Sequence, residues 1–284
     1  MTSSIRPLTG KARVAGLIGW PVSHSRSPRL HSYWLAEHGI DGAYVPLPVA
    51  ADAVETAVRG LAAAGLCGVN VTIPHKRAVL ALCDRVDDIA HRIGAVNVMV
   101  FGEDGIAGSN TDVFGFMENL KAGAPAFETA SAPAVLLGAG GGARAVAVGL
   151  LDAGVPELRL CNRSREHAEK LAADVGGAVT VLPWEERGAA LAGAGLLVNS
   201  TSLGMTGQRP LDLPLDELAA EAVVCDLVYS PLETALLTAA RAKGCTAVDG
   251  LGMLLHQGRP CFSAWFGRDP SVTPELRAFV MDEG

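Results

Sequence analysis

A glycine-rich turn between two apolar segments restricts the fold of this chain more than any other feature. AVLLG (134–138) is predicted to be a buried strand, and an alanine- and valine-rich helix is predicted to follow from Gly142. The intervening GAGGGA fits G-x-G-x-x-A, in which the first glycine permits a tight turn and the second lets a pyrophosphate approach the backbone. The start of the helix adds N–H donors. The pattern predicts a dinucleotide site formed by Gly138, Ala139, Gly140, Gly141, Gly142 and Ala143. A turn with a purely structural role is the alternative.

The end of the next predicted strand indicates which dinucleotide is bound. A site that prefers NAD places an acidic residue there, which accepts a hydrogen bond from the ribose 2′-hydroxyl. Here ELRLCN (157–162) is followed by Arg163, Ser164 and Arg165. No acidic residue lies between the end of this predicted strand and Glu166. Because two guanidinium groups and a hydroxyl suit a 2′-phosphate, NADP is the predicted cofactor. The alternative is that both arginines are solvated loop residues.

Strands and helices alternate along most of the chain. In the second half the predicted strands lie at 134–138, 157–162, 178–182, 195–201, 222–228 and 245–250. Strands separated by helices form a parallel sheet that is covered on both faces. The first half has predicted strands at 14–19, 42–49 and 68–73, and a hairpin in which residues 103–105 join AVNVMVF to GIAGSN. The predicted fold class is α/β with two domains, an N-terminal α/β substrate domain with a mostly parallel sheet and a C-terminal Rossmann-type NADP-binding domain.

The length of the chain, 284 residues, allows about two domains. GAPAFETASAP (123–133) is the predicted linker, because proline, alanine and serine interrupt the helical pattern there. The C-terminal residues are predicted to form two helices that pack on the first domain. We therefore expect a substrate-binding catalytic domain at 1–112, completed by 251–284, and a Rossmann-type domain at 113–250.

Charge and cysteine content argue against several classes of protein. The 23 Lys+Arg and 30 Asp+Glu give a net charge of −7, and no basic block is present that could bind nucleic acid. The six cysteines form no CxxC motif, so no metal site is predicted, and scattered cysteines in apolar segments are typical of reduced cytoplasmic proteins. We see neither a signal peptide nor an apolar run that could span a membrane. We expect a cytoplasmic protein with a small-molecule substrate, and whether it forms a homodimer stays open.

Lys76 and Asp112 are the candidate acid–base residues. Pro74, in VNVTIPHK, is predicted to open a helix whose apolar face runs from Val79 to Ile93. Lys76 would then lie in the first turn, where the helix dipole and partial burial lower the pKa of a lysine. A carboxylate at Asp112 would hold the Lys76 ammonium but raise its pKa. The alternatives are a surface lysine without a role and an aspartate that caps a helix from residue 113.

The segment WPVSHSRSP (20–28) is rich in hydroxyl groups. Ser27 and Pro28 predict the start of a helix, as N-cap and first-turn residue, and Gly39 predicts its end. The hydroxyls of Ser25 and Ser27 are also suited to bind a polar substrate. For Ser27, helix capping and substrate contact are both open.

These motifs follow one another in the order found in shikimate dehydrogenases, a family that this chain resembles. The resemblance rests on GWPVSHSRSPRLH (19–31), VNVTIPHK, AVN (95–97), SNTD (109–112), GAGGGA, NRS, NSTSLGM (199–205), CDLVY (225–229) and DGLGMLLHQ (249–257). It covers about residues 13–266, and the ordered set is far more specific than any single motif. It implies reversible, NADPH-dependent reduction of 3-dehydroshikimate to shikimate, a step of chorismate and aromatic amino acid biosynthesis.

The resemblance also implies a role for each matching residue. Lys76 would donate or accept the proton at the reacting oxygen, with Asp112 as its partner. The substrate's carboxylate and hydroxyls would be held by Ser25, Ser27, Thr72, Asn97, Asp112, Tyr229 and Gln257. Besides the glycine turn, the cofactor would be held by Asp88, Asn162, Arg163, Ser164, Arg165, Leu227 and Gly250.

The chain departs from the family pattern beside the expected 2′-phosphate. The family often has N-R-T and, after two further residues, another basic side chain, whereas Ser164 and His167 occupy those positions here. Arg163 is then the principal expected phosphate contact, with Arg165 as a substitute, and strict preference for NADP stays open. A quinate/shikimate dehydrogenase with broader substrate or NAD use is one alternative function. A catalytically silent, ligand-sensing relative is another, against which the retention of Lys76 and Asp112 argues.

Overall fold

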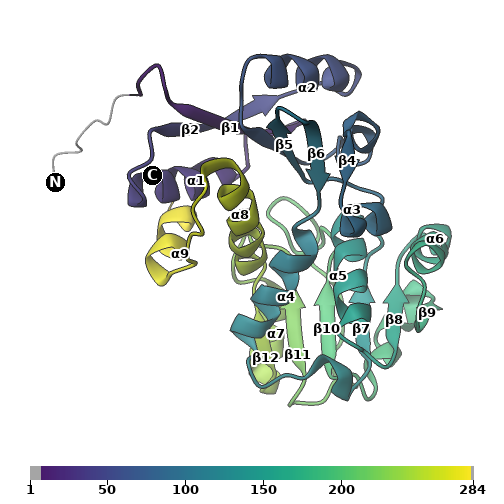
Figure 1. Cartoon of the computed structure of the whole chain (residues 1–284). Coiled ribbons are helices and arrows are strands. Elements are labelled where there is room, and N and C mark those ends of the chain that lie inside the picture. The colour runs from purple at the N-terminus through teal and green to yellow at the C-terminus, as the bar shows by residue number, and fades with distance from the viewer. Residues whose placement is uncertain (1–7, 283–284) are drawn as a thin grey trace. The chain divides into compact units, whose positions relative to one another are not determined.

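The structure, a computed structural model, describes residues 8–282 and divides into two compact units (Figure 1). Unit 2 is Asp112–Gln257, and unit 1 contains the described residues up to Thr111 and from Gly258 onward. Each unit is built on a six-stranded sheet with helices packed against it. The predicted fold class, α/β with two mostly parallel sheets, is confirmed.

The sheet of unit 1 has the strand order β2-β1-β3-β5-β6-β4. Its strands are β1 (Arg13–Gly19), β2 (Gly42–Pro48), β3 (Gly68–Val71), β4 (Arg85–Val86), β5 (Val98–Gly102) and β6 (Gly105–Ser109). β1 is parallel to β2 and β3, whereas β5 is antiparallel to β3 and β6, so the predicted hairpin is confirmed. Because β5 runs the opposite way, its first residue lies at the same edge as the last residues of β1, β3 and β6.

Helices cover the sheet of unit 1. They are α1 (Ser27–Glu37), η1 (Ala51–Ala53), α2 (Val54–Ala63), η2 (Ala78–Leu82), α3 (Asp88–Ile93), α9 (Pro274–Met281) and the part of α8 (Leu251–Phe266) from Gly258 onward. Gly39 has φ 63° just after α1 and ends it as predicted. Trp34 of α1 and Trp265 of α8 are fully buried, and their indole N–H groups donate to the carbonyls of Ser271 and Met99. These contacts tie the C-terminal helices to the first sheet.

All strands of unit 2 are parallel, in the order β12-β11-β10-β7-β8-β9. They are β7 (Ala134–Leu137), β8 (Leu158–Cys161), β9 (Val179–Leu182), β10 (Leu196–Asn199), β11 (Val223–Asp226) and β12 (Thr246–Val248). The chain builds outward from β7 in one direction and from β10 in the other. This is the Rossmann strand order, in which ligands bind at the carboxyl ends of the strands where the order reverses.

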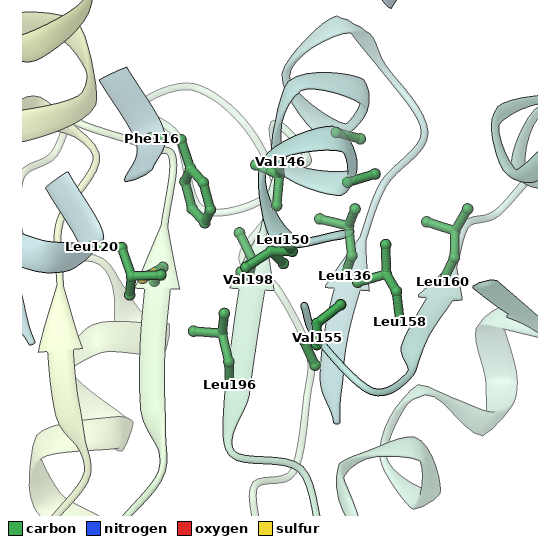
Figure 2. Packing of buried hydrophobic residues seen from close by; sticks show 14 of the residues in the cluster. Phe116, Leu120, Leu136, Val146, Leu150, Val155, Leu158, Leu160, Leu196 and Val198 are labelled. Carbon is green, nitrogen blue, oxygen red and sulfur yellow. The ribbon is translucent and has the colours of Figure 1, made fainter. Parts of the chain in front are cut away.

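The helices of unit 2 bury apolar side chains against both faces of this sheet. They are α4 (Asp112–Gly123), η3 (Thr129–Ser131), α5 (Gly141–Asp152), α6 (Arg165–Val175), η4 (Trp184–Arg187), η5 (Ala189–Leu191), α7 (Ala235–Lys243) and the first part of α8. On one face, Leu136 and Val198 of the strands meet Val146 and Leu150 of α5 (Figure 2). Leu237 of α7 belongs to the core on the other face. A strand that is covered on both sides is continuously apolar, which is why these strands could be recognised in the sequence.

The predicted linker at 123–133 is wrong as a domain boundary. These residues lie inside unit 2, where Ala124 is buried and Phe127 packs against the core. The chain passes between the units at 111–112 and again within helix α8, at 257–258. The predicted passages are 112–113 and 250–251, so the second differs by most of two helical turns.

The predicted helix from Pro74 to Ile93 is also wrong. Residues 73–77 form a turn, followed by η2, the short strand β4 and the separate helix α3. β4 pairs in parallel with β6, and the Asp84 carboxylate accepts from the Ile106 N–H over 2.7 Å. Pairing with the sheet therefore prevails over the helical spacing of the apolar residues. Lys76 therefore lies in a turn and not in the first turn of a helix.

The start of α1 differs in detail from its prediction. Ser27 is the first residue of the helix, and Arg26 is the N-cap, whose side chain makes no capping hydrogen bond. Pro28 occupies the first turn, as expected. The hydroxyl of Ser27 is therefore not used in capping. Among all the helices of the described chain, none is long and apolar enough to cross a membrane.

Candidate functional site

The predicted substrate residues of unit 1 gather at one edge of its sheet. Thr72 directly follows β3, Asn97 directly precedes the antiparallel β5, and the loop containing Ser25 follows β1. The topology brings these positions to the same edge. The Thr72 N–H donates to the Ile18 carbonyl over 2.9 Å, which continues the pairing of β1 and β3 beyond the end of the strand.

The turn that carries Lys76 is held by buried contacts on both sides. The His75 N–H donates to the Thr72 carbonyl over 2.9 Å, and the buried His75 ring meets the Val49 carbonyl through Nε2 at 2.7 Å. The Val96 N–H donates to the Lys76 carbonyl over 2.8 Å. The Lys76 backbone is thus fixed between the end of β3 and the residues that precede β5, while its side chain is half-buried.

Asn97 is buried and bonded to the segment that leads to Asp112. Its Oδ1 accepts from the Thr111 N–H over 2.9 Å, and its Nδ2 donates to the Thr111 hydroxyl over 3.2 Å. Asn110, just before, donates from Nδ2 to the Ala95 carbonyl over 2.9 Å. These bonds fix the exit of β6 against the start of β5.

The loop that carries Ser25 and Ser27 is tied to the last helix. The Ser25 hydroxyl oxygen accepts from the Ser27 N–H over 3.2 Å. Between them, Arg26 donates to the Val280 carbonyl over 3.0 Å, and Arg29 donates to the Phe279 carbonyl over 2.8 Å. Two arginines thus bind carbonyl groups at the C-terminal end of α9, where a helix carries partial negative charge. The side chains of Ser25 and Ser27 are half-buried at the sheet edge.

In unit 2, close packing of two helices brings the elements that carry Asp112 and Gln257 together. Asp112 is the first residue of α4 and is buried. One turn later, a Cβ on Gly115 would lie 2.7 Å from Cβ of Gln257 and from the Met253 carbonyl oxygen, so only glycine permits this approach of α4 to α8. Asn119, further along α4, donates to the Asp249 carbonyl over 2.7 Å. Asp112 and Lys76 belong to different units.

The glycine turn has the geometry of a phosphate cradle. Gly138 has φ 104°, and a Cβ there would lie 2.6 Å from the Ser200 hydroxyl. At Gly140 and Gly141 a Cβ would meet nothing within 4 Å. Gly140 is the N-cap of α5, a helix of 12 residues, and its lack of a side chain leaves the first N–H groups of the helix without a side-chain cap from this position. The turn is therefore suited to a pyrophosphate.

Leu227 and Gly250 follow β11 and β12 at the same edge. A Cβ on Gly250 would lie 2.3 Å from the Leu227 carbonyl oxygen, and one on Gly142 would lie 3.3 Å from Leu227 Cδ1. Leu227 thus lies between the glycine turn and the start of α8. Tyr229 lies two residues further along and is half-buried.

The segment expected to bind the 2′-phosphate contains one arginine that makes no other polar contact within residues 8–282. The Ser164 hydroxyl caps α6 by accepting from the His167 N–H, and Asn162 donates to the Ser164 carbonyl over 2.8 Å. Arg165 is paired with Glu169 at 2.7 Å. Arg163 is exposed, and within residues 8–282 its guanidinium has no hydrogen bond or ion pair. Arg163 can therefore bind a phosphate without breaking an existing contact, whereas Arg165 cannot.

Asp88 is the one predicted cofactor residue that belongs to unit 1. It is the exposed first residue of α3 in unit 1, and the neighbouring Asp87 caps that helix through the Ala90 N–H. The glycine turn, the 162–165 segment, Leu227 and Gly250 all belong to unit 2. A cofactor role for Asp88 stays a prediction.

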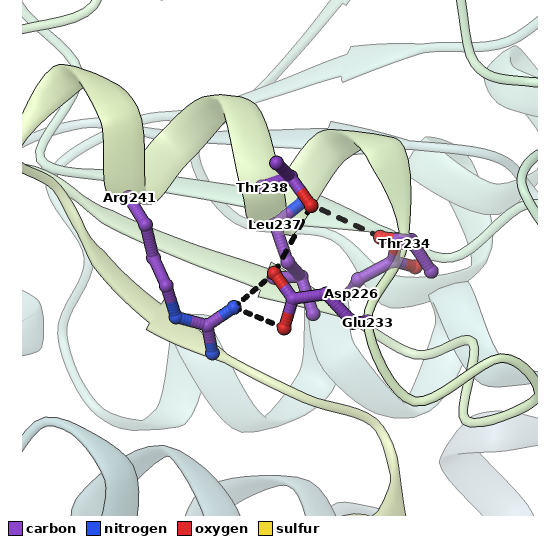
Figure 3. A network of polar contacts seen from close by, with 6 residues as sticks. All are labelled: Asp226, Glu233, Thr234, Leu237, Thr238 and Arg241. Carbon is purple, nitrogen blue, oxygen red and sulfur yellow. Dashed lines mark hydrogen bonds and ion pairs between the residues drawn. The ribbon is translucent and has the colours of Figure 1, made fainter.

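A buried polar network at the ends of β10 and β11 lies outside the set of predicted site residues. The Asp226 carboxylate accepts from Asn199 Nδ2 over 2.9 Å and from the Val228 N–H over 3.1 Å. It also accepts from the Thr234 hydroxyl over 2.7 Å (Figure 3). Burial raises the pKa of Asp226, and these hydrogen bonds oppose the increase. The available signal was a polar residue at the last position of two otherwise apolar strands.

This network extends to the helix that follows it. The Thr234 hydroxyl also accepts from the Leu237 N–H over 3.3 Å and so caps α7, while Glu233 binds Arg241 of the same helix (Figure 3). Asn199 Oδ1 accepts from the N–H and the hydroxyl of Thr201. The network therefore shapes both loops at the carboxyl edge of β10 and β11.

Comparisons with known proteins give the same assignment to both units. A family model described as the shikimate dehydrogenase substrate binding domain matches residues 17–99, and one described as shikimate / quinate 5-dehydrogenase matches residues 122–205. A protein of Paramagnetospirillum magneticum named shikimate dehydrogenase (NADP(+)) is 59% identical over 275 residues, which cover 96% of this chain and 100% of that protein.

Two solved structures of the same fold show the range of activities among relatives. Shikimate 5-dehydrogenase of Thermus thermophilus, solved with NADP(H) and shikimate, has a TM-score of 0.84 at 37% identity and covers 94% of this chain and 98% of its own. Quinate dehydrogenase of Corynebacterium glutamicum, solved with NAD, has a TM-score of 0.88 at 32% identity, with coverage of 94% and 98%.

Proposed function

The chain belongs to the shikimate dehydrogenase family, and we propose that Lys76 and Asp112 carry the proton transfer in its NADP-dependent oxidoreductase reaction. One observation carries this proposal. The Lys76 backbone is fixed at the sheet edge of unit 1 that also presents Thr72 and Asn97, and Asn97 holds Thr111, the residue before Asp112. An ammonium group, a carboxylate and neutral hydrogen-bonding groups thus come from neighbouring segments.

NADPH, when bound, supplies a hydride to the carbonyl carbon of 3-dehydroshikimate. The carbonyl oxygen then carries a developing negative charge and needs a proton. Lys76 Nζ donates that proton, and in shikimate oxidation neutral Lys76 accepts it back. Asp112 holds the ammonium group in place and accepts from a substrate hydroxyl.

The residues expected to contact the substrate suit a polyhydroxylated acid. In unit 1, Ser25, Ser27 and Thr72 offer hydroxyls and Asn97 offers an amide; in unit 2, Gln257 offers an amide and Tyr229 a phenol. A site built of hydrogen-bonding groups rejects a substrate that lacks the matching hydroxyl, because its own polar groups are then left unpaired.

The residues of unit 2 hold the cofactor. The glycine turn binds the pyrophosphate, and Arg163 binds the 2′-phosphate.

Replacing Lys76 tests the proposal directly. In Lys76→Ala we expect kcat for NADP-dependent shikimate oxidation to fall about 10²–10⁴-fold, the range of general acid–base catalysis, while KM for shikimate changes little. Asp112→Asn, which keeps the shape but removes the charge, should also lower kcat. Lys121→Ala is the matched control, because Lys121 lies exposed in the last turn of α4.

The two kinetic constants separate the possible roles of Lys76. If kcat survived in Lys76→Ala and only KM for shikimate rose, Lys76 would be a binding group and the acid–base role would be wrong. Quinate serves as the second substrate in the same assay. It carries one more hydroxyl at the carbon that bears the carboxylate, so activity with quinate reports the space beside Ser25 and Ser27.

We further propose that the enzyme acts in the cytoplasm and has no nucleic-acid partner. The net charge of −7 supports a protein without a nucleic-acid partner. All six cysteines are free thiols, and burial raises the pKa of Cys83 and of Cys161 to about 11. Unreactive thiols of this kind support a reducing compartment, the cytoplasm. Sedimentation at micromolar concentration would show whether the enzyme is a homodimer.

A further inference from the structure

We propose that Tyr44 and Asn70 are positioning residues that orient Ser27 and Asn97 for binding of the substrate. The proposal rests on the proposed function, because it takes Ser27 and Asn97 as substrate contacts. Tyr44 lies in β2 and Asn70 in β3, on either side of β1. Tyr44 is buried and Asn70 is half-buried, and neither belongs to the motif residues expected to touch the substrate.

The hydrogen bonds of Asn70 define its orientation. Its Nδ2 donates to the Asn97 carbonyl over 3.2 Å and to the Cys261 thiol over 3.4 Å. A carbonyl oxygen can only accept, so the amide NH₂ must face Asn97 and the Oδ1 must face the other way. Asn70 thus supports the backbone of Asn97 from behind.

The orientation of Asn70 in turn defines the role of the Tyr44 hydroxyl. The Tyr44 phenol donates to Asn70 Oδ1 over 2.7 Å. With its single proton used there, the phenol oxygen can only accept from a further neighbour. Ser27 lies one helical turn before His31, whose ring stacks on Tyr44, so both side chains lie on the face of α1 that meets this ring. The Ser27 hydroxyl also opposes the increase in the pKa of Tyr44 that burial causes. Because the phenol oxygen can only accept, Ser27 is the donor toward it, and Tyr44 sets the direction of the Ser27 hydroxyl.

The Tyr44 ring is held in place by stacking. His31 of α1 lies parallel to it, with ring centroids 4.2 Å apart, and is itself only 1% exposed. Trp265 of α8 contacts both rings, at centroid distances of 6.0 Å from Tyr44 and 5.6 Å from His31. A ring packed in this way cannot turn to offer its hydroxyl elsewhere. Hydrogen bonds thus link Asn97, Asn70 and Tyr44, and the face of α1 that packs on Tyr44 carries Ser27.

Tyr44→Phe removes the hydroxyl and leaves the stacked ring in place. We expect KM for shikimate to rise about threefold to tenfold, the range of one ordinary hydrogen bond, while kcat and KM for NADP stay unchanged. Tyr33→Phe is the matched control, because Tyr33 lies on α1 against Phe279 and its hydroxyl makes no hydrogen bond within the described residues. An equal rise of KM in both variants would overturn the proposal.

A double-mutant cycle shows whether Tyr44 acts through Ser27. If it does, Ser27→Ala raises KM for shikimate, and adding Tyr44→Phe to it raises KM no further. Additive increases would overturn the proposal, because Tyr44 would then affect binding by another route. A purely structural role would lower the melting temperature or the active fraction, at constant KM, and would equally overturn it.

Failure of this inference can be told apart from failure of the proposed function. Lys76→Ala tests the proposed chemistry without involving Tyr44. If Lys76→Ala loses kcat and Ser27→Ala raises KM, but Tyr44→Phe leaves KM unchanged, only the positioning role is wrong. If Ser27→Ala leaves KM for shikimate unchanged, the substrate assignment of Ser27 is wrong and the positioning role falls with it.

Discussion

Asn199 donates from its side-chain amide to the Asp226 carboxylate over 2.9 Å and so joins the last residues of β10 and β11. Asn199 is 0% exposed and Asp226 is 1% exposed. The loops beyond these residues, which contain Thr201 and Leu227, lie where a Rossmann fold binds the reactive end of its dinucleotide. The pair thus shapes two loops of the proposed cofactor site without belonging to the glycine turn.

Asp226→Ala should lower the free energy of unfolding by about 3 kcal/mol, because several buried donors lose their acceptor at once. We also expect KM for NADP to rise in the protein that still folds, because the Leu227 loop is no longer held. Urea unfolding and initial-rate kinetics measure the two effects. Asp212→Ala, an exposed aspartate of the same unit, is the control. Unchanged stability in Asp226→Ala would mean that solvent replaces the carboxylate.

Two glycines of the phosphate turn should respond differently to the same substitution. Gly138→Ala should cost about 1–3 kcal/mol of stability, because φ is 104° and Cβ would lie 2.6 Å from the Ser200 hydroxyl. Gly141→Ala should leave stability unchanged, because its Cβ meets nothing within 4 Å. It should nevertheless raise KM for NADP, since the methyl group occupies the approach of the pyrophosphate. An unchanged KM for NADP in Gly141→Ala would contradict the proposal that the glycine turn binds the pyrophosphate.

The Rossmann half could be predicted from the sequence because its signals are local. A strand covered on both faces is continuously apolar, and Gly138 has a backbone conformation that strongly favours glycine. The segment after Pro74 could not be predicted, because its apolar spacing suits a helix while β4 gains its partner from β6, further along the chain. The boundary inside α8 carries no local signal, since one continuous helix contributes to both units.

The candidate site shows the same limit. Lys76, Asn97 and Asp112 belong to motifs and could be proposed from the sequence alone. Tyr44 and Asn70 could not, because their importance comes from a hydrogen bond between β2 and β3, strands that are separated by β1. The preference for Arg163 over Arg165 was already expected from the family pattern, and the structure adds the pairing of Arg165 with Glu169 within α6.

Burial of His31 should make the protein less stable as the pH falls below neutrality. Desolvation lowers the pKa of His31 to about 3. The unfolded chain binds a proton near its ordinary value of 6.5 while the folded chain does not, so stability is complete above about pH 6.5 and declines toward pH 3. From pH 7 to pH 5 the loss should be about 2 kcal/mol.

The comparison of two variants isolates the contribution of this histidine. His31→Gln removes the titrating group, so its unfolding free energy should depend less on pH between 7 and 5 than that of the parent chain. His167→Gln, on the exposed surface of α6, should keep the parent slope. Urea unfolding at several pH values measures both. Identical slopes for His31→Gln and the parent would show that His31 does not cause the dependence.

Arg163 should decide the preference between the two nicotinamide cofactors. Its guanidinium is exposed and makes no ion pair within the described chain, whereas the neighbouring Arg165 is bound to Glu169. A charge-assisted bond to the 2′-phosphate contributes about 1.5–3 kcal/mol, so Arg163→Ala should raise KM for NADPH about 10- to 100-fold. KM for NADH, which lacks that phosphate, should change little, and Arg165→Ala should affect both cofactors weakly. Steady-state rates measured with NADPH and with NADH give the two KM values of each variant. Equal losses with NADPH and NADH in Arg163→Ala would place the 2′-phosphate elsewhere, because only a group that contacts this phosphate can distinguish the two cofactors.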